Sequence, residues 1–555
     1  MAESLFSTLS EEFVEEQNNE EEDPEILKNN MLTSYEFKTP VEYHNAKSLN
    51  DIIKSDLELD SKENKNIYSQ LLHSPQEYPQ LLMNQWSSLY TTNTDYLKDH
   101  QKLLKKYKKK ETTNMDEFVS SYLDFKGEQN FLGKYQYIQF RRFFFLNSII
   151  GFLQCLAIYN ICSPLLSLFA PIIGLIVPYF IFYFRGIKMS FSSYMSMVKM
   201  MILNNSVVKN LLNFRKGNLQ NKCYTLVYIF FYILGVYNNV NSCIQFYKNT
   251  KYMIEFNSNY YNYLEHGDDL IDHIHESTQS LESFTDFNKT MLQYKNTIQE
   301  MKSKVMTLNQ QQNKMIKCGQ IGVLLKYNFD IFYNKTYHDT IMYLIYLNQY
   351  HKNMKDISHL VKEKKLRSCK YNTSKATKVK DMYYLTHMNN NPVKNTISLD
   401  KNVMITGPNA SGKTTIIKSA IINIFLSQSI GVGCYRSCVL NPYSHFHSYL
   451  NIPDTSNRDS LFQAEARRCK NIFSFIQKNR DKRHLCIFDE IYSGTNPQDA
   501  VRCASVYIKG MNELKQNTDY ILTTHYLELC EQFEYKDKVK NQKMDVIENE
   551  NEEDI

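Results

Sequence analysis

The chain has 555 residues, and its 64 lysines and arginines nearly balance 59 aspartates and glutamates, for a formal net charge of +5. This length allows two to four domains, and the near balance excludes nucleic-acid binding through a basic field over the whole molecule. Twelve cysteines without a CxxC pair, and no recognisable secretory signal, predict reduced thiols rather than a disulfide framework.

Both ends of the chain are acidic. Ten of residues 1–25 and six of residues 544–555 are Asp or Glu, so we expect disordered acidic tails over 1–25 and 547–555. Residues 26–140 are polar and mainly helical in pattern. A basic run there indicates a solvated helix face or, alternatively, a contact with phosphates or lipid headgroups; it comprises Lys102, Lys105, Lys106, Lys108, Lys109 and Lys110.

The composition changes abruptly in an apolar region, residues 141–245. Residues 143–184 contain no Asp, Glu, Lys or Arg, and a segment of this length suits two membrane-spanning helices of about 20 residues each. A turn between them is indicated by Asn160, Ser163 and Pro164. The segment is flanked by Arg141, Arg142, Arg185 and Lys188. Positive charge at both outer ends predicts a transmembrane hairpin with both ends in the cytoplasm; the alternative is a helical pair buried in a large soluble core.

A third apolar stretch, residues 224–237, is short and suits a third span, a re-entrant segment or a buried helix. Residues 250–370 return to charged helical sequence. A heptad seam in this region comprises Phe287, Met291, Tyr294, Ile298, Met301, Val305 and Leu308. About three heptads predict a long helix packed against a partner, with a free coiled coil as the alternative. The basic stretch at 362–380 is expected to form a loop-rich connection to the last domain.

A glycine-rich loop is the strongest signal in the chain. Residues 407–414 fit G-x-x-x-x-G-K-[ST], between a short buried strand at 403–405 and an apolar-rich helix at 415–426. Backbone N–H groups of such a loop and the positive end of the helix can surround phosphate oxygens. The predicted nucleotide-binding residues of this segment are Gly407, Pro408, Asn409, Ala410, Ser411, Gly412, Lys413, Thr414 and Thr415. Lys413 would reach the β- and γ-phosphates, and the Thr414 hydroxyl would ligate Mg²⁺.

Two further strands end in polar residues. The strand at 485–488 ends in Asp489, which can hold Mg²⁺ through water, and Glu490, which is placed to polarise the attacking water as general base. The strand at 520–523 is followed by Thr524 and His525, and an imidazole there can sense or stabilise a γ-phosphate. These elements predict an α/β P-loop ATPase domain over 385–546, with a mixed or parallel sheet flanked by helices, preceded by a mainly α-helical region.

Several motifs of this domain resemble the MutS family of DNA mismatch-repair proteins. The loop contains Gly407-Pro408-Asn409, the acidic strand continues as Asp489-Glu490-Ile491 and Ser493-Gly494-Thr495, and the third strand ends in Thr524-His525-Tyr526. The stretch from Ser460 to Glu465 is similar to the family's serine-containing signature loop, and residues 539–546 are similar to the strand after its switch histidine. Together these motifs cover about residues 392–546.

The resemblance implies roles that the spacing alone does not give. Asn409 would help orient the attacking water, His525 would be the switch histidine, and Ser460 would reach the partner's nucleotide across a dimer interface. The resemblance also implies ATP and Mg²⁺ as cofactors, a homodimer with composite ATP sites, and DNA, mismatched or branched, as a partner. The helices of 250–370 fall where that family places its lever and clamp segments.

The sequence also departs from the family. Ala410 and Ser411 replace Gly-rich loop positions, no mismatch-reading domain is recognisable, and the chain ends before the family's usual helical dimerisation segment. Membrane-like segments are foreign to the repair enzymes, and an ABC transporter is disfavoured because no L-S-G-G-Q signature precedes Asp489.

We therefore expect a MutS-like ATPase that drives a DNA clamp in mismatch repair or DNA maintenance. The alternative is a membrane-tethered mechanochemical ATPase that does not recognise mismatches. The expected location is the membrane, with the ATPase on the cytoplasmic side, or alternatively the soluble intracellular space.

Overall fold

The computed structural model describes residues 23–59, 67–72, 82–108, 116–187, 189–204, 219–309, 320–373, 376–450, 460–533 and 538–545. The predictions for most of both acidic tails, and for Lys109, Lys110 and Lys188, lie outside these residues. The chain divides into two compact units. Unit 1 comprises Met1–Met31, Asn114–His266 and Thr297–Thr340, and unit 2 comprises Leu32–Thr113, Gly267–Asn296 and Ile341–Ile555.

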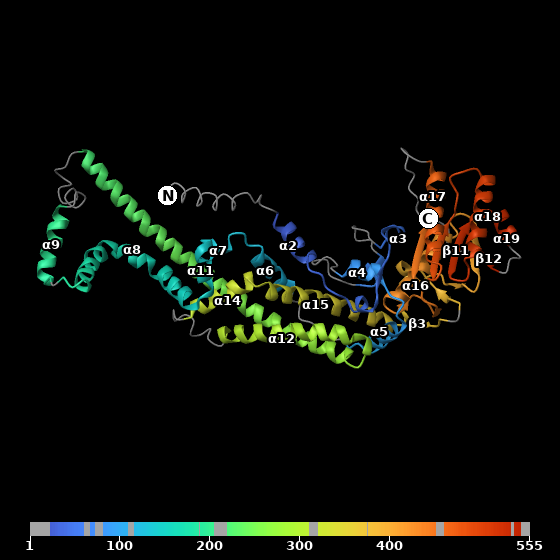
Figure 1. Cartoon of the computed structure of the whole chain (residues 1–555), viewed down its shortest axis with the longest axis horizontal. Helices are drawn as coiled ribbons and strands as arrows, with labels where there is room; N and C mark the ends of the chain where they lie inside the picture. Colours follow the sequence, from blue (N-terminus) through green and yellow to red (C-terminus); the bar gives the residue numbers. More distant parts are fainter. Residues whose placement is uncertain are drawn as a thin grey trace. The chain divides into compact units, whose positions relative to one another are not determined.

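Unit 1 is helical throughout its described part (Figure 1). Its own helices are α6 (Asp116–Lys126), α7 (Phe131–Lys134), the 3₁₀ helix η3 (Arg141–Ser148), α8 (Ile150–Phe184), α9 (Phe191–Asn204) and α14 (Ile321–Tyr333). Four helices belong to both units: α2 (Pro24–Thr33), α11 (Leu219–Thr278), α12 (Thr285–Asn309) and α15 (Lys335–Lys362).

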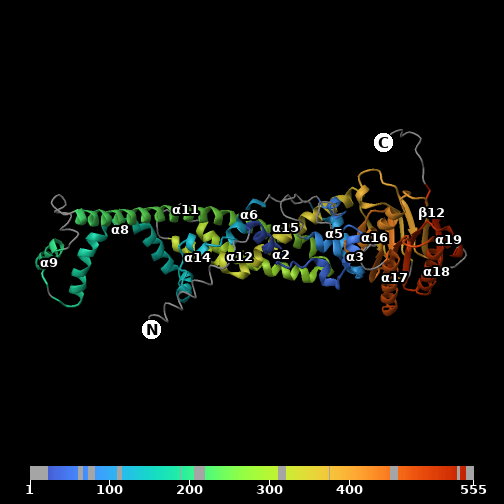
Figure 2. The ribbon, with the colours of Figure 1, turned by 90° about the horizontal axis from the view of Figure 1, so that it is seen from above.

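The turn predicted inside residues 143–184 is wrong. Helix α8 continues over 35 residues, and the 3₁₀ helix η3 precedes it where the first span was expected to begin. The Ser163 and Ser167 hydroxyls donate to the carbonyls of Asn160 (3.1 Å) and Pro164 (2.9 Å). A proline without an N–H and serines bonded back to the backbone bend a helix without ending it. Figure 2 shows α8 as two straight helical parts that meet at a bend.

The first part of α8 lies beside α11, and the two helices are antiparallel. The Tyr232 hydroxyl donates to the Leu168 carbonyl (2.7 Å), and Cys243 Sγ lies 3.6 Å from the Ile161 carbonyl oxygen. The contact moves backwards along α8 as it moves forwards along α11, so the two helices run in opposite directions. Residues 224–237, the predicted third segment, belong to this 60-residue helix rather than to a separate element.

The heptad seam predicted in residues 250–370 forms a packed stripe on α12. Phe287, Met291, Ile298, Met301 and Val305 are each at most 2% exposed. The side chains therefore pack against the protein, as the first of the two alternatives predicted, and do not line a free coiled coil.

Unit 2 contains two five-stranded sheets. The first is parallel throughout, in the order β12 (Val539–Lys543), β6 (Asn402–Thr406), β11 (Thr518–Thr524), β10 (His484–Asp489) and β9 (His445–Tyr449). The second is mixed, in the order β5 (Asn395–Ser398), β4 (Lys378–Met382), β8 (Ser437–Leu440), β3 (Arg367–Tyr371) and β7 (Val432–Gly433). The predicted combination of parallel and mixed sheets with helices is present.

The remaining elements of unit 2 are a two-stranded pair and short or flanking helices. The pair is β1 (Lys47–Ser48) with β2 (Leu89–Tyr90). The α-helices are α3 (Asp51–Asp56), α4 (Met83–Ser88), α5 (Thr94–Lys106), α16 (Lys413–Ser429), α17 (Leu461–Lys478), α18 (Pro497–Glu513) and α19 (Leu527–Phe533). The 3₁₀ helices are η1 (Pro40–His44), η2 (Ile67–Gln70), η4 (Glu282–Phe284) and η5 (Leu385–His387).

The basic stretch at 362–380 was expected to be rich in loops, and that expectation is wrong, because it contributes β3 and β4. In β4, Val379 and Met382 are buried, whereas Lys378 and Lys380 are exposed. The lysines thus occupy the outer face of a strand whose other face packs on the core. The mixed sheet therefore starts before residue 385, where the last domain was predicted to begin.

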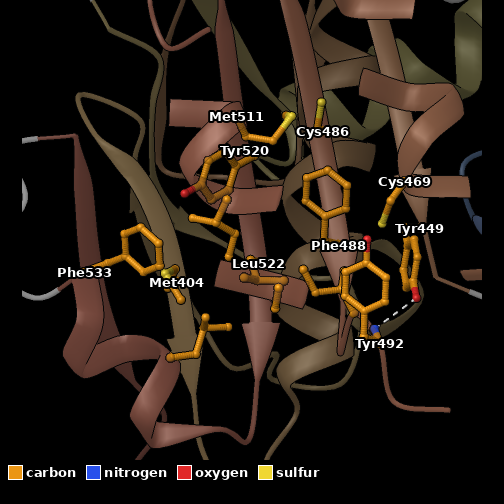
Figure 3. Packing of buried hydrophobic residues seen from close by; sticks show 14 of the residues in the cluster. Met404, Tyr449, Cys469, Cys486, Phe488, Tyr492, Met511, Tyr520, Leu522 and Phe533 are labelled. Carbon is orange, nitrogen blue, oxygen red and sulfur yellow. Dashed lines mark hydrogen bonds between the residues drawn. The ribbon is translucent and has the colours of Figure 1, made fainter. Parts of the chain in front are cut away.

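One hydrophobic cluster of unit 2 lies against one face of the parallel sheet (Figure 3). Met404, Phe488 and Leu522 project from three neighbouring strands, and Cys469 and Met511 face them from α17 and α18. All five side chains are at most 2% exposed. This packing helps to fix the strands relative to one another, and the candidate site lies at the strand ends.

Candidate functional site

Three parallel strands end together at one edge of the sheet. β6 leads into the glycine-rich loop, β10 ends at Asp489, and β11 ends at Thr524. Asp489 is in register with Thr523, and Thr524 with Thr406. The carboxyl edge of a parallel sheet is where α/β proteins bind ligands, and here the register alone brings the predicted site residues to one level.

The loop between β6 and α16 uses left-handed backbone at two positions. Gly412, the N-cap of α16, has φ +85°, and Ala410 has φ +62°. Glycine tolerates this conformation, whereas alanine adopts it at a cost of about 1–2 kcal/mol. A Cβ added at Gly407 would lie 2.8 Å from both Met544 Cβ and Ser411 Oγ. The loop is therefore tightly folded, and its departure from a Gly-rich pattern at Ala410 introduces local strain.

Lys413 directs its charge into this loop. The side chain is 6% exposed, and Nζ donates to the carbonyls of Gly407 and Pro408, both at 3.1 Å. Nζ also lies 3.4 Å from Glu490 Oε1. A nearly buried ammonium at the positive end of α16 makes this the part of the site suited to an anion.

Asp489 lies beside the loop, and its carboxylate accepts hydrogen bonds from two threonine hydroxyl groups. The Thr414 hydroxyl donates to Oδ2 (2.7 Å), and the Thr523 hydroxyl donates to Oδ1. A carboxylate and a hydroxyl at this spacing are hard oxygen ligands of the kind that Mg²⁺ prefers. The predicted metal ligands, Thr414 and Asp489, are thus adjacent.

Glu490 lies between a lysine and a histidine. Its φ is +48°, and its N–H donates to the Thr523 carbonyl (3.1 Å), which fixes the backbone where β10 ends. Its Oε2 lies 3.7 Å from His525 Nδ1. The structure therefore brings together Lys413, Thr414, Asp489, Glu490 and His525.

Five of the other predicted residues lie at the surface, whereas Gly407, Ser411 and Gly412 are half-buried. Pro408, Asn409, Ala410 and Thr415 are exposed on the loop and the first turn of α16. Ser460 is exposed at the N-terminus of α17, where its hydroxyl accepts from the Gln463 N–H in a capping box. Its hydrogen bonds are local, so within one chain Ser460 acts as a helix cap.

Sequence analysis missed the role of Glu465. This carboxylate is 2% exposed; Oε1 accepts from the Ser493 N–H (3.0 Å) and hydroxyl (2.9 Å), and Oε2 accepts from the Gly494 N–H (3.2 Å). It thereby holds the segment that follows Glu490. The signal was present, because Glu465 falls on the apolar stripe of α17 with Cys469 and Ile472, where a solvated acid is not expected.

Thr523 and Tyr449 were also missed as supporting residues. The Thr523 hydroxyl orients Asp489, and the Tyr449 hydroxyl accepts from the Tyr492 N–H at 3.3 Å (Figure 3). Both contacts join residues from different strands or loops, 34 and 43 positions apart. No local pattern identifies such a pair.

These features define an α/β domain with a strand–loop–helix unit, a buried lysine and two acids at the carboxyl edge of a parallel sheet. Residues 403–555 match the family model of MutS domain V. Endonuclease MutS2 of Clostridium botulinum (strain ATCC 19397 / Type A) is 28% identical over 140 residues, which are 25% of this chain and 17% of that protein.

Two repair proteins match the same part of the chain. DNA mismatch repair protein MutS of Christiangramia forsetii is 28% identical over 154 residues, 27% of this chain and 17% of that protein. DNA mismatch repair protein MSH3 of Candida albicans is 31% identical over 142 residues, 24% of this chain and 13% of that protein. These similarities to MutS-family proteins lie in the C-terminal part of the chain, and they cover only 13–17% of the length of these relatives.

Proposed function

We propose that the chain is a Mg²⁺-dependent ATPase that uses hydrolysis to drive a MutS-type clamp on DNA. The observation that supports it most is the constellation of Lys413, Thr414, Asp489 and Glu490 at one sheet edge. Each of these side chains has a distinct task in phosphoryl transfer to water.

Binding would rest on the loop and α16. The loop N–H groups and Lys413 would hold the β- and γ-phosphates, and Thr414 with Asp489 would hold Mg²⁺, which neutralises phosphate charge when bound. The donor set fits such a group, because the Thr414 hydroxyl and the Asp489 carboxylate are 2.7 Å apart beside the nearly buried Lys413 ammonium. Thr523 would keep Asp489 oriented through its hydroxyl.

Hydrolysis would rest on Glu490. Its carboxylate would accept a proton from the attacking water, with Asn409 orienting that water and His525 contacting Glu490 from the far side. His525 Nδ1 lies 3.7 Å from Glu490 Oε2, so the histidine is the base's neighbour without a hydrogen bond to it. His525 is thus placed to report the state of the site to α19, which begins two residues later.

The proposed partner is DNA, mismatched or branched, together with a second copy of the chain. Two of the similar proteins are named DNA mismatch repair proteins, and a third is named an endonuclease. In a homodimer, the exposed Ser460 would complete the nucleotide site of the opposite chain. A membrane-tethered ATPase that does not recognise mismatches is the second candidate, and the exposed apolar helices of unit 1 favour it.

The test is ATP turnover by the full chain with no DNA and with homoduplex, mismatched and branched DNA. Glu490→Gln should bind ATP but hydrolyse it about 10²–10⁴-fold more slowly, whereas Glu513→Gln, an exposed acid at the end of α18, should match the parent. Parental turnover by Glu490→Gln would refute the catalytic assignment. If none of the three DNAs changes turnover, the DNA part fails and the membrane-tethered candidate is favoured.

A further inference from the structure

A long segment of unit 1 exposes its apolar side chains. We define the arm as residues 129–254, between Glu128 and Glu255, which includes α8, α9 and the first part of α11. Among the described residues, 47 large hydrophobic side chains are exposed, and 38 of them lie between Phe140 and Tyr252. Soluble proteins rarely expose apolar patches of more than a few hundred Å², so this surface requires a partner.

Two helices of the arm are long and apolar enough to cross a membrane. They are the Ile150–Ala170 part of α8 and the apolar start of α11, and only 17% and 6% of their apolar windows are buried. A core helix of a soluble protein is mostly buried, whereas these two segments are mostly exposed. The 21 residues of the α8 segment extend about 31 Å, close to the roughly 30 Å of a bilayer's hydrocarbon layer.

The arm also differs from the rest of the chain in charge. It contains twelve lysines and arginines and no aspartate or glutamate. The rest of the chain therefore has 52 cations against 59 acids, a net charge of −7. A segment of 126 residues without one acid, in a chain that is otherwise acidic, is complementary to a negatively charged surface.

Four of these cations lie where the apolar helices end. No charged residue occurs in 143–184 or 223–247. Arg141 and Arg142 precede α8, and Lys248 and Lys251 follow the apolar part of α11. The antiparallel pairing of the two helices places these four at the same end, and the Asn249 amide donates to the Lys134 carbonyl there (2.6 Å). Lysine and arginine at the ends of apolar helices extend to the headgroup layer.

We propose that the arm inserts into a bilayer of anionic phospholipid as an antiparallel hairpin of α8 and α11, with Arg141, Arg142, Lys248 and Lys251 among the lipid headgroups. The hairpin thus pairs residues 150–170 with the start of α11, instead of two helices inside 143–184. This inference does not depend on the proposed ATPase.

Other partners fit the arm less well. A second copy of the chain would cover one stripe of each helix, whereas apolar side chains surround both helices, as expected in lipid. DNA phosphates would match the cations but would leave the apolar side chains without a partner. An anionic bilayer satisfies both features.

The test uses the full chain, reconstituted from detergent with vesicles of phosphatidylcholine alone or mixed with phosphatidylglycerol, and followed by flotation. Leu165→Asp and Phe230→Asp alter exposed side chains (59% and 61%) on the two helices, and Val506→Asp alters an exposed side chain (72%) on α18 as the control. Each arm substitution should weaken association about 100-fold, and the control should not. Circular dichroism in detergent checks that the variants keep their helices.

A second set of variants tests the charge. Replacing Arg141, Arg142, Lys248 and Lys251 by Gln should weaken association with anionic vesicles about fivefold per cation and leave association with phosphatidylcholine unchanged. The proposal is overturned if the parent chain does not float, if the Asp variants float like Val506→Asp, or if lipid charge has no effect. It is also overturned if the chain is a soluble oligomer without detergent. Turnover measured on the same samples shows separately whether the ATPase proposal holds.

Discussion

The parallel-sheet part of unit 2 and the arm of unit 1 arrange the same kinds of residue in opposite ways. In the sheet, Phe488, Tyr520 and Leu522 are at most 2% exposed and packed beneath α17 and α18. In the arm, residues of similar size such as Phe184 (83%) and Phe230 (61%) face outwards. Other protein elements shield the apolar side chains of the sheet from water. The apolar side chains of the arm would be shielded from water only by a partner outside the described residues, such as lipid.

Polar groups follow the same contrast. Unit 2 buries polar side chains and satisfies them with specific partners, as with Glu465, Asp489 and Gln428, whose amide donates to the Tyr443 carbonyl (2.8 Å). The apolar part of α8 contains few polar side chains, and its Ser163 and Ser167 hydroxyls donate to backbone carbonyls of the same helix. A site for ions therefore suits the sheet, and the proposed contact with lipid suits the arm. The predictions that follow separate the two parts.

The largest expected effect concerns the nucleotide site and leaves the arm unaffected. Lys413→Ala removes the buried ammonium, so turnover should fall by at least about 10²–10³-fold, while vesicle flotation is unchanged. Ser460→Ala should also be inactive if Ser460 acts across the dimer. Mixing the two inactive chains should restore roughly a quarter of parental turnover, because half of randomly formed dimers are mixed and each has one intact site.

Failure of the mixture to recover activity would argue for a self-contained site in each chain. Parental turnover of Ser460→Ala alone would show that this serine is only the cap of α17. A mixture of each variant with itself is the matched control, and flotation of every sample checks that the arm has not changed.

The elements around the site were predictable because each has a local signature. A buried strand before a glycine-rich loop predicted residues 403–405, and an apolar run that ends in two acids predicted residues 485–488; these lie in β6 and β10. The heptad spacing of α12 identified its buried stripe because burial repeats with the helical period. The same local information placed Asp489, Glu490 and His525 after strand ends, and Lys413 and Thr414 at the start of the helix that follows β6 and its loop. A parallel sheet brings these positions to one edge.

The errors arose where local and tertiary information differ. Pro164 with Asn160 and Ser163 predicted a turn, but a helix can bend at proline when its other hydrogen bonds persist. The lysines of β4 predicted a loop, but they lie on the exposed face of a strand whose buried face has only Val379 and Met382. The bonds of Glu465 and Thr523 join positions 28 and 34 residues apart and require the fold itself.

The next largest expected effect is that of pH, which should change the stability of unit 2 and leave the membrane association of the arm unchanged. His445, His447 and His484 stack in unit 2, with ring centroids 5.1 and 5.3 Å apart and His447 Nε2 at 3.1 Å from His484 Nδ1. Burial, aided by the neighbouring His484, lowers the pKa of His447 to about 3. Burial, with Lys47, His484 and Lys482 nearby, lowers the pKa of His445 to about 4 despite Asp481.

The sign of the effect follows from these depressed values. An unfolded histidine binds a proton near pH 6.5, whereas the folded cluster does not, so the unfolded state holds more protons below that pH. Stability contributed by His447 is therefore present above about pH 6.5 and falls as the pH is lowered, by about 3 kcal/mol at pH 4.

The measurement is urea unfolding between pH 7 and pH 4, followed by the fluorescence of Trp86, the only tryptophan and a residue of unit 2. His447→Asn should flatten the pH dependence, and His387→Asn, at an exposed position in η5, should not. The arm has no histidine, so flotation should be the same at pH 7 and pH 5. Equal pH dependence of His447→Asn and the parent would contradict the assignment.

The smallest expected effect lies at the start of the arm, where α8 packs on α14. The Gly322 N–H donates to Gln154 Oε1 (2.9 Å), and a Cβ at Gly322 would lie 2.7 Å from the Ile150 carbonyl oxygen and from Gln154 N. Backbone atoms cannot rotate away as a side chain can, so Gly322→Ala should destabilise this packing by about 1–2 kcal/mol.

Gly151 lies on α8 with nothing within 4 Å of an added Cβ, so Gly151→Ala should instead stabilise the helix by about 0.5–1 kcal/mol. Hydrogen exchange of α14 in vesicle-bound protein measures both, with faster exchange in Gly322→Ala only and ATP turnover unchanged in both. If the two variants exchange alike, α8 is not seated on α14, and the contrast between a protein-packed start and a lipid-covered remainder of the arm fails.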